Sequence, residues 1–310
     1  MNSGSAAGAV AFLGPEGTFT SEAAEIAAPD ASRLPLATIP EVLDAVRDGR
    51  ARLGVVPLEN SIEGAVNLTL DALAFGRPGI FLRAEVALPI TMALLAPPGT
   101  ELAGICEVRS QPVALAQCRR WLDANLPDAP TIAASSTAEA ARQAAGTSGV
   151  AALGTSRAAQ RYGLEVLVPD IADYPGNTTR FGVLGRAMAK PTGADKTSLV
   201  VFLGQDRPGL LLRVLEEFAL RGINLAKIES RPTKQALGEY CIVLDCEGHP
   251  VDARVGEALR GVHRHVAELR VLGAYPRADG LHAAPVRADS DQAYGAASSW
   301  FEGLLAEVDR

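Results

Sequence analysis

The first part of the chain alternates short apolar runs with Ala- and Glu-rich amphipathic stretches. Apolar runs of roughly four to eight residues between turn residues indicate strands, and apolar positions spaced three or four apart indicate helices. Strands are predicted at 9–13, 52–57, within 80–96, and at 106–109, 131–134, 149–153, 165–168 and 180–184, with helices starting near residues 22, 39, 64, 111, 137 and 155. Strands that alternate with helices are typical of an α/β fold, here with a largely parallel sheet.

The rhythm changes after a linker-like stretch at 189–195. Strand, helix, strand, strand, helix and strand then follow at 197–203, 210–221, 226–230, 239–245, 251–263 and 269–272. This βαββαβ order is that of the ferredoxin-like unit. We therefore expect an α/β domain over 8–188, a ferredoxin-like domain over 196–275 and a C-terminal tail over 276–310, in which 292–308 has an amphipathic helical pattern.

Composition narrows the class of protein. A length of 310 residues fits about two domains, and 48% hydrophobic residues indicates a well-buried globular chain. The net charge of −7 argues against a nucleic-acid partner, because such a partner usually meets a basic face. It does not exclude an anionic substrate, since one arginine in a cleft can dominate the local field.

Four cysteines are scattered along the chain, without a Cys-x-x-Cys pair and without a histidine at metal-ligand spacing. Free thiols in a reducing cytoplasm are the simplest interpretation. The N-terminal segment lacks the pattern of a signal peptide, and the apolar runs are too short to span a bilayer. We expect a cytoplasmic protein with no membrane association, no metal and no cofactor.

Candidate chemistry is densest at Asn177-Thr178-Thr179-Arg180-Phe181, between a Pro-Gly turn and an apolar run. The segment combines an amide, two hydroxyls, a guanidinium and an aromatic ring. The arginine fork matches a carboxylate, and the hydroxyls can donate to oxygens. The segment therefore suits a small anionic molecule that carries a ring. Taken alone, a loop that leads into an ordinary strand explains it about equally well.

Two further polar segments follow predicted strands. The loop 14–21 offers backbone N–H groups and hydroxyls, including that of Thr18, at a helix start, which favours an anion. It matches neither a Walker motif nor Gly-x-Gly-x-x-Gly. Glu59-Asn60-Ser61 follows a strand end, where ligands bind in α/β sheets. A helix cap and an Asx or Ser turn are the plain alternatives for these two segments.

Ser110 and Gln117 are seven residues apart, so both are expected on one face of a helix over 111–126. Ser110 is also the predicted N-cap of that helix, and a solvated position is the plain alternative for Gln117. Cys118 is interpreted as a packed thiol, because no histidine lies nearby in sequence to activate it. These candidate residues are neutral hydrogen-bond donors together with one arginine and one glutamate. Such a set is suited to binding a small polyanion and rearranging its bonds, and less suited to hydrolysis through a covalent intermediate.

Six motifs in order along the chain carry a family resemblance. They are Gly14 to Phe19, Val56 to Ser61 with Gly64, Ser110 to Cys118, Asn177 to Phe181, Gly209-Leu210-Leu211 and Glu229-Ser230-Arg231-Pro232. The first four resemble motifs of prephenate dehydratase, and the last two resemble the Gly-Ala-Leu and Glu-Ser-Arg-Pro motifs of that family's regulatory ACT domain. The match runs from about residue 10 to about residue 275. Leu58, where Ile is common, and Leu210, in place of Ala, are departures.

The resemblance implies a two-lobed, periplasmic-binding-protein-like catalytic domain with the active site in the cleft between its lobes. It implies a monofunctional carbon–oxygen lyase that converts prephenate to phenylpyruvate, water and carbon dioxide in phenylalanine biosynthesis. Thr179 matches the catalytic threonine and would donate a hydrogen bond to the leaving oxygen; Glu59, if protonated by burial, could be the acid. Arg180 would anchor the pyruvyl carboxylate and Phe181 would pack near the ring. The other expected substrate-binding residues are Thr18, Asn60, Ser61, Ser110 and Gln117.

The resemblance also implies feedback inhibition by L-phenylalanine, bound between paired ACT domains. The chain is expected to be a homodimer or homotetramer through its ACT and catalytic domains. The residues expected at the allosteric site are Gly209, Leu210, Leu211, Asn224, Leu225, Glu229, Ser230, Arg231 and Pro232. A strand edge closed by a proline is the plain alternative for 229–232. Removing the residues after Lys190 is expected to leave activity but abolish the inhibition.

Two alternatives stay open at this point. An amino-acid-sensing protein without catalysis could be built from the same two domains, although neither a helix-turn-helix nor a basic segment is evident in the sequence. Arogenate, which carries an ammonium group where prephenate has a keto group, could be the substrate, and the sequence does not distinguish the two.

Overall fold

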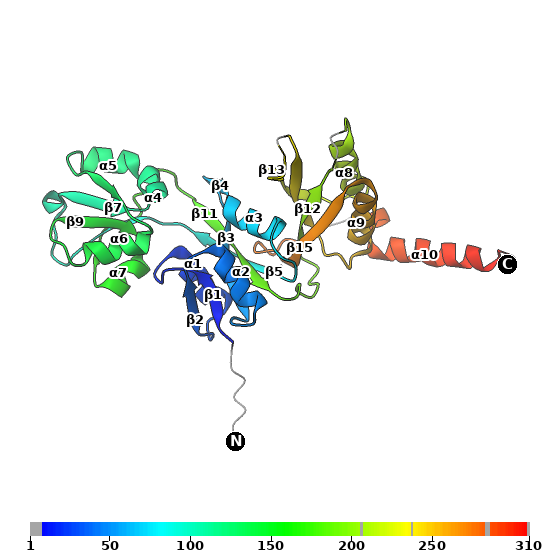
Figure 1. The fold of residues 1–310 in the computed structure, drawn as a ribbon, viewed down its shortest axis with the longest axis horizontal. Coiled ribbons are helices and arrows are strands. Elements are labelled where there is room, and N and C mark those ends of the chain that lie inside the picture. The colour runs from blue at the N-terminus through cyan, green and yellow to red at the C-terminus, as the bar shows by residue number, and fades with distance from the viewer. Residues whose placement is uncertain (1–7, 205–206, 237, 283–285, 309–310) are drawn as a thin grey trace, which may run out of the picture. The chain divides into compact units, whose positions relative to one another are not determined.

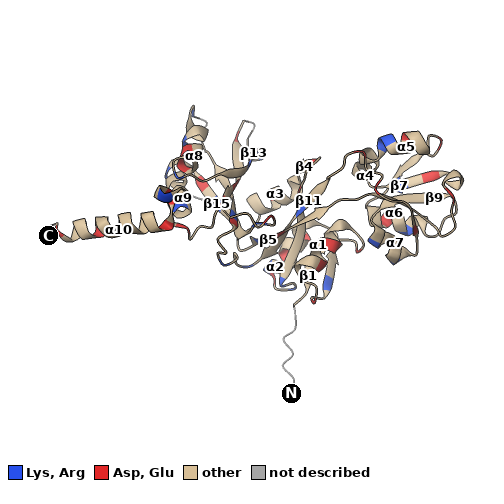
Figure 2. Ribbon diagram, turned by 180° about the vertical axis from the view of Figure 1, so that it is seen from behind, with Lys and Arg blue, Asp and Glu red and all other residues tan. Residues whose placement is uncertain are grey.

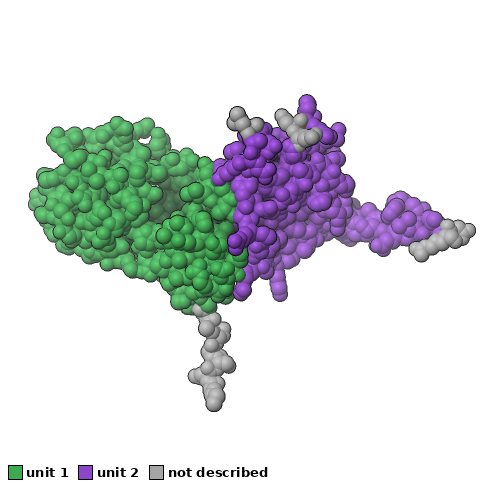
Figure 3. Space-filling model, viewed as in Figure 1, with its two compact units in different colours: residues 1–72, 86–184 green, residues 73–85, 185–310 purple. Residues whose placement is uncertain are grey.

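The computed structural model describes residues 8–204, 207–236, 238–282 and 286–308 (Figure 1). Two compact units divide the chain (Figure 3). Unit 1 comprises the described residues up to Ala72 together with Val86–Leu184, and unit 2 comprises Leu73–Glu85 together with the described residues from Gly185 onward. The chain therefore enters unit 2 early, returns to unit 1, and then enters unit 2 again.

One sheet region of unit 1 contains the N-terminal strands. The strand order is β11 (Thr178–Gly185), β3 (Leu53–Asn60), β1 (Val10–Leu13) and β2 (Arg33–Leu36). Strand β1 is parallel to β2 and β3, whereas β11 is antiparallel to β3. The helices here are α1 (Phe19–Ala27) and α2 (Ile39–Arg47). Gly54 lets α2 approach β3, because a Cβ there would lie 2.9 Å from Val46 Cγ2.

A second sheet forms the other lobe of unit 1. Its strand order is β10 (Glu165–Val168), β6 (Ala93–Ala96), β9 (Val150–Gly154), β7 (Glu107–Ser110) and β8 (Thr131–Ala133). Its helices are α4 (Pro112–Gln117), α5 (Arg119–Asn125), α6 (Thr137–Ala144) and α7 (Ser156–Tyr162), with a 3₁₀ turn at Leu102–Gly104. Small buried residues of α6 and β9, such as Ala141 and Ala152, fill the core of this lobe.

The prediction of a largely parallel sheet is wrong. Strands β6 and β9, β10 and β6, and β11 and β3 pair antiparallel, whereas β7 pairs parallel with β8 and β9. The chain enters the second lobe through β6 and leaves it for the first lobe through β11. Neither strand is joined to its antiparallel neighbours by the helical crossover that a parallel pair needs. Strand β2 was not predicted, because Pro35 breaks its pattern; a proline is tolerated at a sheet edge.

Unit 2 contains the expected ferredoxin-like fold. Its elements are β12 (Asp195–Phe202), α8 (Leu210–Ala219), β13 (Leu225–Pro232), β14 (Tyr240–Glu247), α9 (Ala253–His265) and β15 (Glu268–Pro276). The antiparallel strand order is β13-β14-β12-β15. Val214 and Phe218 of α8 and Val255 and Val262 of α9 are fully buried in one apolar cluster with the sheet.

The early segment of unit 2, Leu73–Glu85, is held firmly by the C-terminal module. It joins the end of α3 (Asn67–Ala74) to the start of β5 (Phe81–Pro89). Glu85 forms an ion pair with Lys196 at 3.1 Å, and the two side chains are 3% and 13% exposed. Gly273 of β15 is in register with Leu82, and a Cβ on Gly273 would lie only 2.1 Å from the Leu82 carbonyl oxygen.

The end of the chain forms helix α10 (Asp291–Ala306), preceded by a 3₁₀ turn at Arg287–Asp289. Figure 1 shows α10 extending from the α9 side of unit 2, and none of its residues is buried. The amphipathic pattern at 292–308 therefore does form a helix. Within the described part of the chain, no helix has both the length and the apolar character needed to cross a membrane.

Candidate active site

The two most polar segments of the sequence lie side by side in unit 1. In the antiparallel pair of β11 and β3, Thr179 is in register with Asn60, and Arg180 with Glu59. Just beyond the strand ends, the Ser61 N–H donates to the Thr178 carbonyl at 2.9 Å, and the Thr178 N–H donates to Ser61 Oγ at 3.0 Å. More than 110 residues of chain separate the two segments, so this register is a tertiary feature.

The Asn60 amide has a fixed orientation. Its Oδ1 accepts the backbone N–H groups of Ile62 and Glu63 at 2.9 and 3.0 Å. Only the amide oxygen can accept from these donors, so Nδ2 must point the other way. There it donates to Asn177 Oδ1 at 2.6 Å and to Thr179 Oγ1 at 2.9 Å.

This orientation determines what the Thr179 hydroxyl can do. An amide nitrogen only donates, so Thr179 Oγ1 is the acceptor in its contact with Asn60. The hydroxyl hydrogen is then available to another acceptor. Thr179 is 9% exposed, so its oxygen lies in a mostly water-excluded position. The geometry thus sets Thr179 up as a hydrogen-bond donor.

Gln117, at the end of α4, joins the second lobe to this network. Its Oε1 accepts from Asn177 Nδ2 at 3.1 Å, and its Nε2 donates to Glu63 Oε1 at 3.1 Å. Gln117 is 5% exposed and Asn177 is 3% exposed, so Gln117 is not the solvated side chain of the plain alternative. The hydrogen bonds run in one consistent direction and end at a carboxylate, which can only accept.

Arg180 and Glu59 form an ion pair across the same two strands. Arg180 Nη2 lies 3.1 Å from Glu59 Oε2, and the side chains are 16% and 37% exposed. The hypothesis that burial protonates Glu59 required a buried carboxyl group, and Glu59 is not buried. In this structure the carboxylate instead orients the guanidinium.

The remaining predicted residues serve local structure. Thr18 caps α1: its Oγ1 accepts from the Ser21 N–H at 3.3 Å and donates to the Pro15 carbonyl at 2.9 Å. Ser110 is fully buried and donates to the Leu153 carbonyl at 2.8 Å. It ends β7 and does not cap α4, whose N-cap is Gln111 without a side-chain bond, so the predicted Ser110 cap is wrong. Ser110 and Gln117 therefore do not share a helix face.

Phe181 and Cys118 belong to the core. Phe181 is 2% exposed and is among the largest fully buried side chains. Cys118 separates α4 from α5, so the single helix predicted over 111–126 is wrong. Burial, with smaller contributions from Asp173 and Asp170, raises the pKa of the Cys118 thiol to about 12. Such a thiol is no nucleophile near neutral pH, in agreement with its interpretation as a packed residue.

A pocket of about 270 Å³ in unit 1 was not anticipated from the sequence. It lies between α1 and α7 and is lined by Phe19, Glu22, Pro89, Thr91, Thr155, Ser156, Arg157 and Gln160. Thr155 caps α7 and also donates to the Gly17 carbonyl at 3.3 Å, which ties the two lobes together. A hydroxyl directly after strand β9 was the available signal. Unit 1 is visibly hollowed on the face shown in Figure 3.

The predicted allosteric residues lie on unit 2. Gly209 has φ +84° and is the N-cap of α8, a left-handed conformation that favours glycine. Leu210 and Leu211 begin the helix. Glu229 to Pro232 end strand β13, which is the outer strand of the β13-β14-β12-β15 group. Glu229 forms ion pairs with Lys227 at 3.2 Å and Arg231 at 3.6 Å, while Asn224 donates to Glu247 at 3.1 Å and Leu225 begins the strand.

No metal site is evident in the described part of the molecule. No group of three or more His, Cys, Asp or Glu residues is arranged to hold a metal ion there. Figure 2 shows Lys and Arg interspersed with Asp and Glu along the ribbon.

Comparison with known proteins identifies the family. Residues 10–189 match the family model of prephenate dehydratase, and residues 197–264 match that of the ACT domain. Prephenate dehydratase from Mycolicibacterium vanbaalenii is 43% identical over 312 residues, which cover 95% of this chain and 97% of that one. The chain belongs to the prephenate dehydratase family.

Solved structures confirm the expected fold class. A crystal structure of prephenate dehydratase from Arthrobacter aurescens, in complex with L-Phe, is 42% identical, with a TM-score of 0.88 over 96% of this chain and 99% of that one. GqqA, described as a novel type of quorum-quenching acylase, is 30% identical, with a TM-score of 0.77 over 86% of this chain and 97% of that one. The family and the ACT domain expected from the six motifs are thus confirmed.

Proposed function

We propose that the chain converts prephenate to phenylpyruvate, water and carbon dioxide, with Thr179 as the catalytic residue. The observation that carries this assignment is the direction of the hydrogen bond from Asn60 Nδ2 to Thr179 Oγ1. It leaves the hydroxyl hydrogen for an acceptor in the cleft. The family membership supplies the reaction.

The reaction requires little chemistry from the protein. The bond from the ring to the departing carboxylate breaks, and its electron pair becomes part of the aromatic ring. The ring C–O bond breaks toward oxygen, and the departing hydroxide takes up one proton from the solvent to become water. A threonine hydroxyl is too weak an acid to transfer a full proton easily. Thr179 therefore acts as a donor whose hydrogen bond strengthens as charge develops on the leaving oxygen.

Arg180 anchors the substrate in this proposal. A guanidinium has five N–H donors, so its contact with Glu59 is compatible with a second carboxylate. The pyruvyl carboxylate is the better target, because a firm grip on the departing carboxylate would stabilise the ground state. Glu59 holds Arg180 in place, and the buried Phe181 supports the strand from the core.

Gln117 and Asn177 position the donor. They link the second lobe to Asn60 through buried hydrogen bonds, so the orientation of Thr179 depends on the second lobe being in place. Ser61 keeps β3 and β11 aligned at their ends. Ser110 and Thr18 act through local structure, because their hydroxyls are already engaged with backbone groups.

Regulation by L-phenylalanine at the ACT domain follows the same reasoning. The relative from Arthrobacter aurescens is described in complex with L-Phe. We assign the site to Gly209-Leu210-Leu211 and Asn224-Leu225 with Glu229-Ser230-Arg231-Pro232. An inhibitor bound there acts only if it prefers one arrangement of the enzyme over another.

Homo-oligomer formation, as a dimer or tetramer, is part of the proposal. Helix α10 has no buried residue, and its Trp300 and Phe301 side chains are 69% and 51% exposed. A helix with no buried residue has little stability in water, and exposed aromatic patches such as this one mark protein–protein interfaces. A cytoplasmic location is also proposed, because all four cysteines are free thiols.

One experiment tests the proposed function. Purified enzyme is mixed with prephenate, and phenylpyruvate is followed by its absorbance with and without L-phenylalanine. Turnover that L-phenylalanine suppresses is the expected result. A parallel reaction with arogenate, followed by the formation of phenylalanine because this substrate keeps its amino group, determines which substrate is preferred. Absence of turnover with both substrates would favour the sensing protein without catalysis.

A further inference from the structure

Unit 2 contains a basic pocket whose lining residues, apart from Leu210, have no assigned function. Its volume is about 470 Å³, and its basic lining residues are Arg207, Arg213, Arg264 and His265. No carboxylate is among the described residues that line it. In a chain with net charge −7, this is a local concentration of positive charge.

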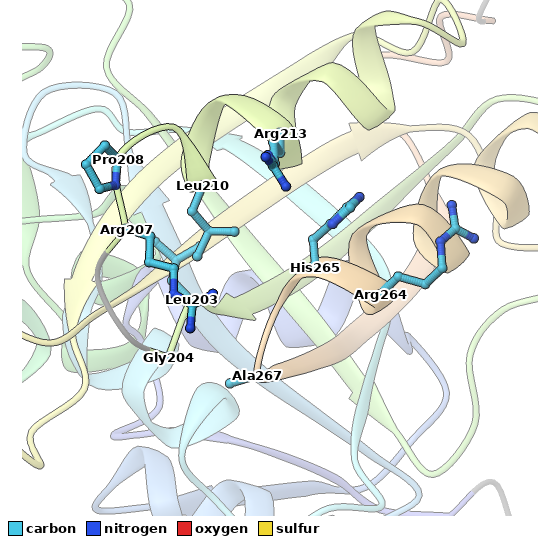
Figure 4. A pocket seen from close by; sticks show the side chains of 9 residues that line it. All are labelled: Leu203, Gly204, Arg207, Pro208, Leu210, Arg213, Arg264, His265 and Ala267. Carbon is cyan, nitrogen blue, oxygen red and sulfur yellow. The ribbon is translucent and has the colours of Figure 1, made fainter.

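Two elements bring the basic side chains together. Arg207 precedes α8 and Arg213 lies in its first turn, whereas Arg264 and His265 end α9. Figure 4 shows Arg213 and His265 on facing sides of the pocket, with Arg207 below Leu210 and Arg264 extending from the rim. The arrangement depends on the antiparallel packing of two helices rather than on one run of sequence.

Part of this charge is not neutralised within the described chain. Arg213 and Arg264 form no ion pair with any residue that the structure describes, and both are exposed. Glu217 lies 3.5 Å from His265 and is also paired with Arg221 at 2.7 Å. Like charges gathered around a cavity repel one another, and Arg213 lies at the helix end where the dipole disfavours a cation. A bound anion would offset both the repulsion between the basic side chains and the unfavourable interaction of Arg213 with the helix dipole.

The pocket shares Leu210 with the assigned allosteric site but none of its other residues. Glu229 to Pro232 lie on β13, at one side of the β13-β14-β12-β15 group, and the pocket includes Ala267, next to β15 at the other side. Strands β14 and β12 lie between them. The exception is Leu210, which lines the pocket and belongs to the expected phenylalanine motif. Binding at one of the two sites can therefore change binding at the other through Leu210.

We propose that this pocket binds a phosphorylated small molecule. Arginine forks match the oxygens of a phosphate group, and three arginines line this pocket. Leu203 and Leu210, with Pro208, form an apolar part of the lining that suits an organic group next to the phosphate. The volume exceeds the roughly 30 Å³ that one water occupies in the liquid by more than tenfold, so the pocket has room for more than a bare ion.

Calorimetric titration of the full chain with phenyl phosphate and with inorganic phosphate tests the proposal. We expect saturable binding at low salt, tighter for phenyl phosphate because the apolar wall contributes. Arg213→Gln and Arg264→Gln should each weaken binding by about tenfold, the order of one charge-assisted hydrogen bond. Arg260→Gln is the matched control: Arg260 lies one turn before Arg264 in α9, is 71% exposed and is paired with Glu257.

The outcomes separate the site from general electrostatics. Loss of binding in the two pocket variants with retention in Arg260→Gln supports the proposal. Equal weakening in all three variants, tighter binding of inorganic phosphate than of phenyl phosphate, or no saturable binding to the wild-type chain overturns it. Unfolding midpoints equal to that of the wild-type chain show that the variants are folded. Because binding is read directly, the result does not depend on the proposed reaction.

Discussion

Replacing Thr179 with valine isolates the hydroxyl that the proposed mechanism uses. Valine has the same shape as threonine, so the packing of this 9% exposed residue is kept. The variant loses the donor to the leaving oxygen. Removing one preorganised donor to a developing negative charge typically lowers kcat by about 10²–10³-fold, or roughly 3–4 kcal/mol. The KM for prephenate should change little, because Arg180 still anchors the substrate.

The structure also predicts that this substitution costs little stability. Asn60 Nδ2 loses Thr179 Oγ1 but keeps Asn177 Oδ1 at 2.6 Å. The loss is thus one hydrogen bond of a donor that stays satisfied, about 0.5–1.5 kcal/mol. Thr178→Val is the matched control on the same strand, because the Thr178 hydroxyl donates only to the Gly176 carbonyl at 3.3 Å.

The assay follows phenylpyruvate absorbance over a range of prephenate concentrations, with urea unfolding of each variant in parallel. Thr179→Ser should retain most activity, since it keeps a hydroxyl. A Thr179→Val enzyme that unfolds normally and keeps more than about a tenth of the wild-type kcat would refute the role of the hydroxyl. A similar loss of kcat in Thr178→Val would show that the strand, not the hydroxyl, is being disturbed.

Three further predictions concern stability and reactivity. Lys196→Met should lower the free energy of unfolding in urea by about 3–5 kcal/mol, because it removes the ammonium group that pairs with the 3% exposed Glu85 carboxylate; a loss below 1 kcal/mol would contradict this. Gly273→Ala should destabilise by at least about 1–3 kcal/mol through overpacking against β5, seen as a lower unfolding midpoint. At pH 8 a thiol reagent should modify the exposed Cys106 but not the buried Cys118, and fast labelling of Cys118 in the folded protein would contradict its burial. Because the pKa of Cys118 is raised to about 12, the stability that its neutral thiol contributes should be lost as the pH rises from about 9 to 12.

The sequence was informative where structure is local. The ferredoxin-like order of unit 2, most strands of unit 1 and the amphipathic C-terminal helix followed from apolar spacing. The polar segments at 59–61 and 177–181 were recognised as candidates from their residue types. Their pairing was not predictable, because strand register depends on the whole sheet.

The failures have non-local causes. The helix predicted over 111–126 is interrupted because Asp173, some fifty residues later, accepts the backbone N–H groups of Arg120 and Trp121 at 3.0 and 3.3 Å and caps α5. Ser110 has the residue type of a cap, but the Leu153 carbonyl of the neighbouring strand takes its hydroxyl. The partial exposure of Glu59 depends on the pairing of β3 with β11, which lies far away in sequence. None of these partners is near in sequence.

The placement of residues 73–85 changes how the enzyme can be dissected. A protein cut after Lys190 keeps this segment but loses the module that covers Glu85, Leu82 and Ile80, which are nearly inaccessible in the whole chain. The fragment would expose the apolar edge at these residues and lose the Lys196 partner of Glu85, so it should aggregate or misfold. Its inactivity would say nothing about where the inhibitor binds. No single cut in the chain therefore separates the catalytic part from the regulatory part. Substitutions within Glu229–Pro232 are the better way to obtain an enzyme that L-phenylalanine does not inhibit.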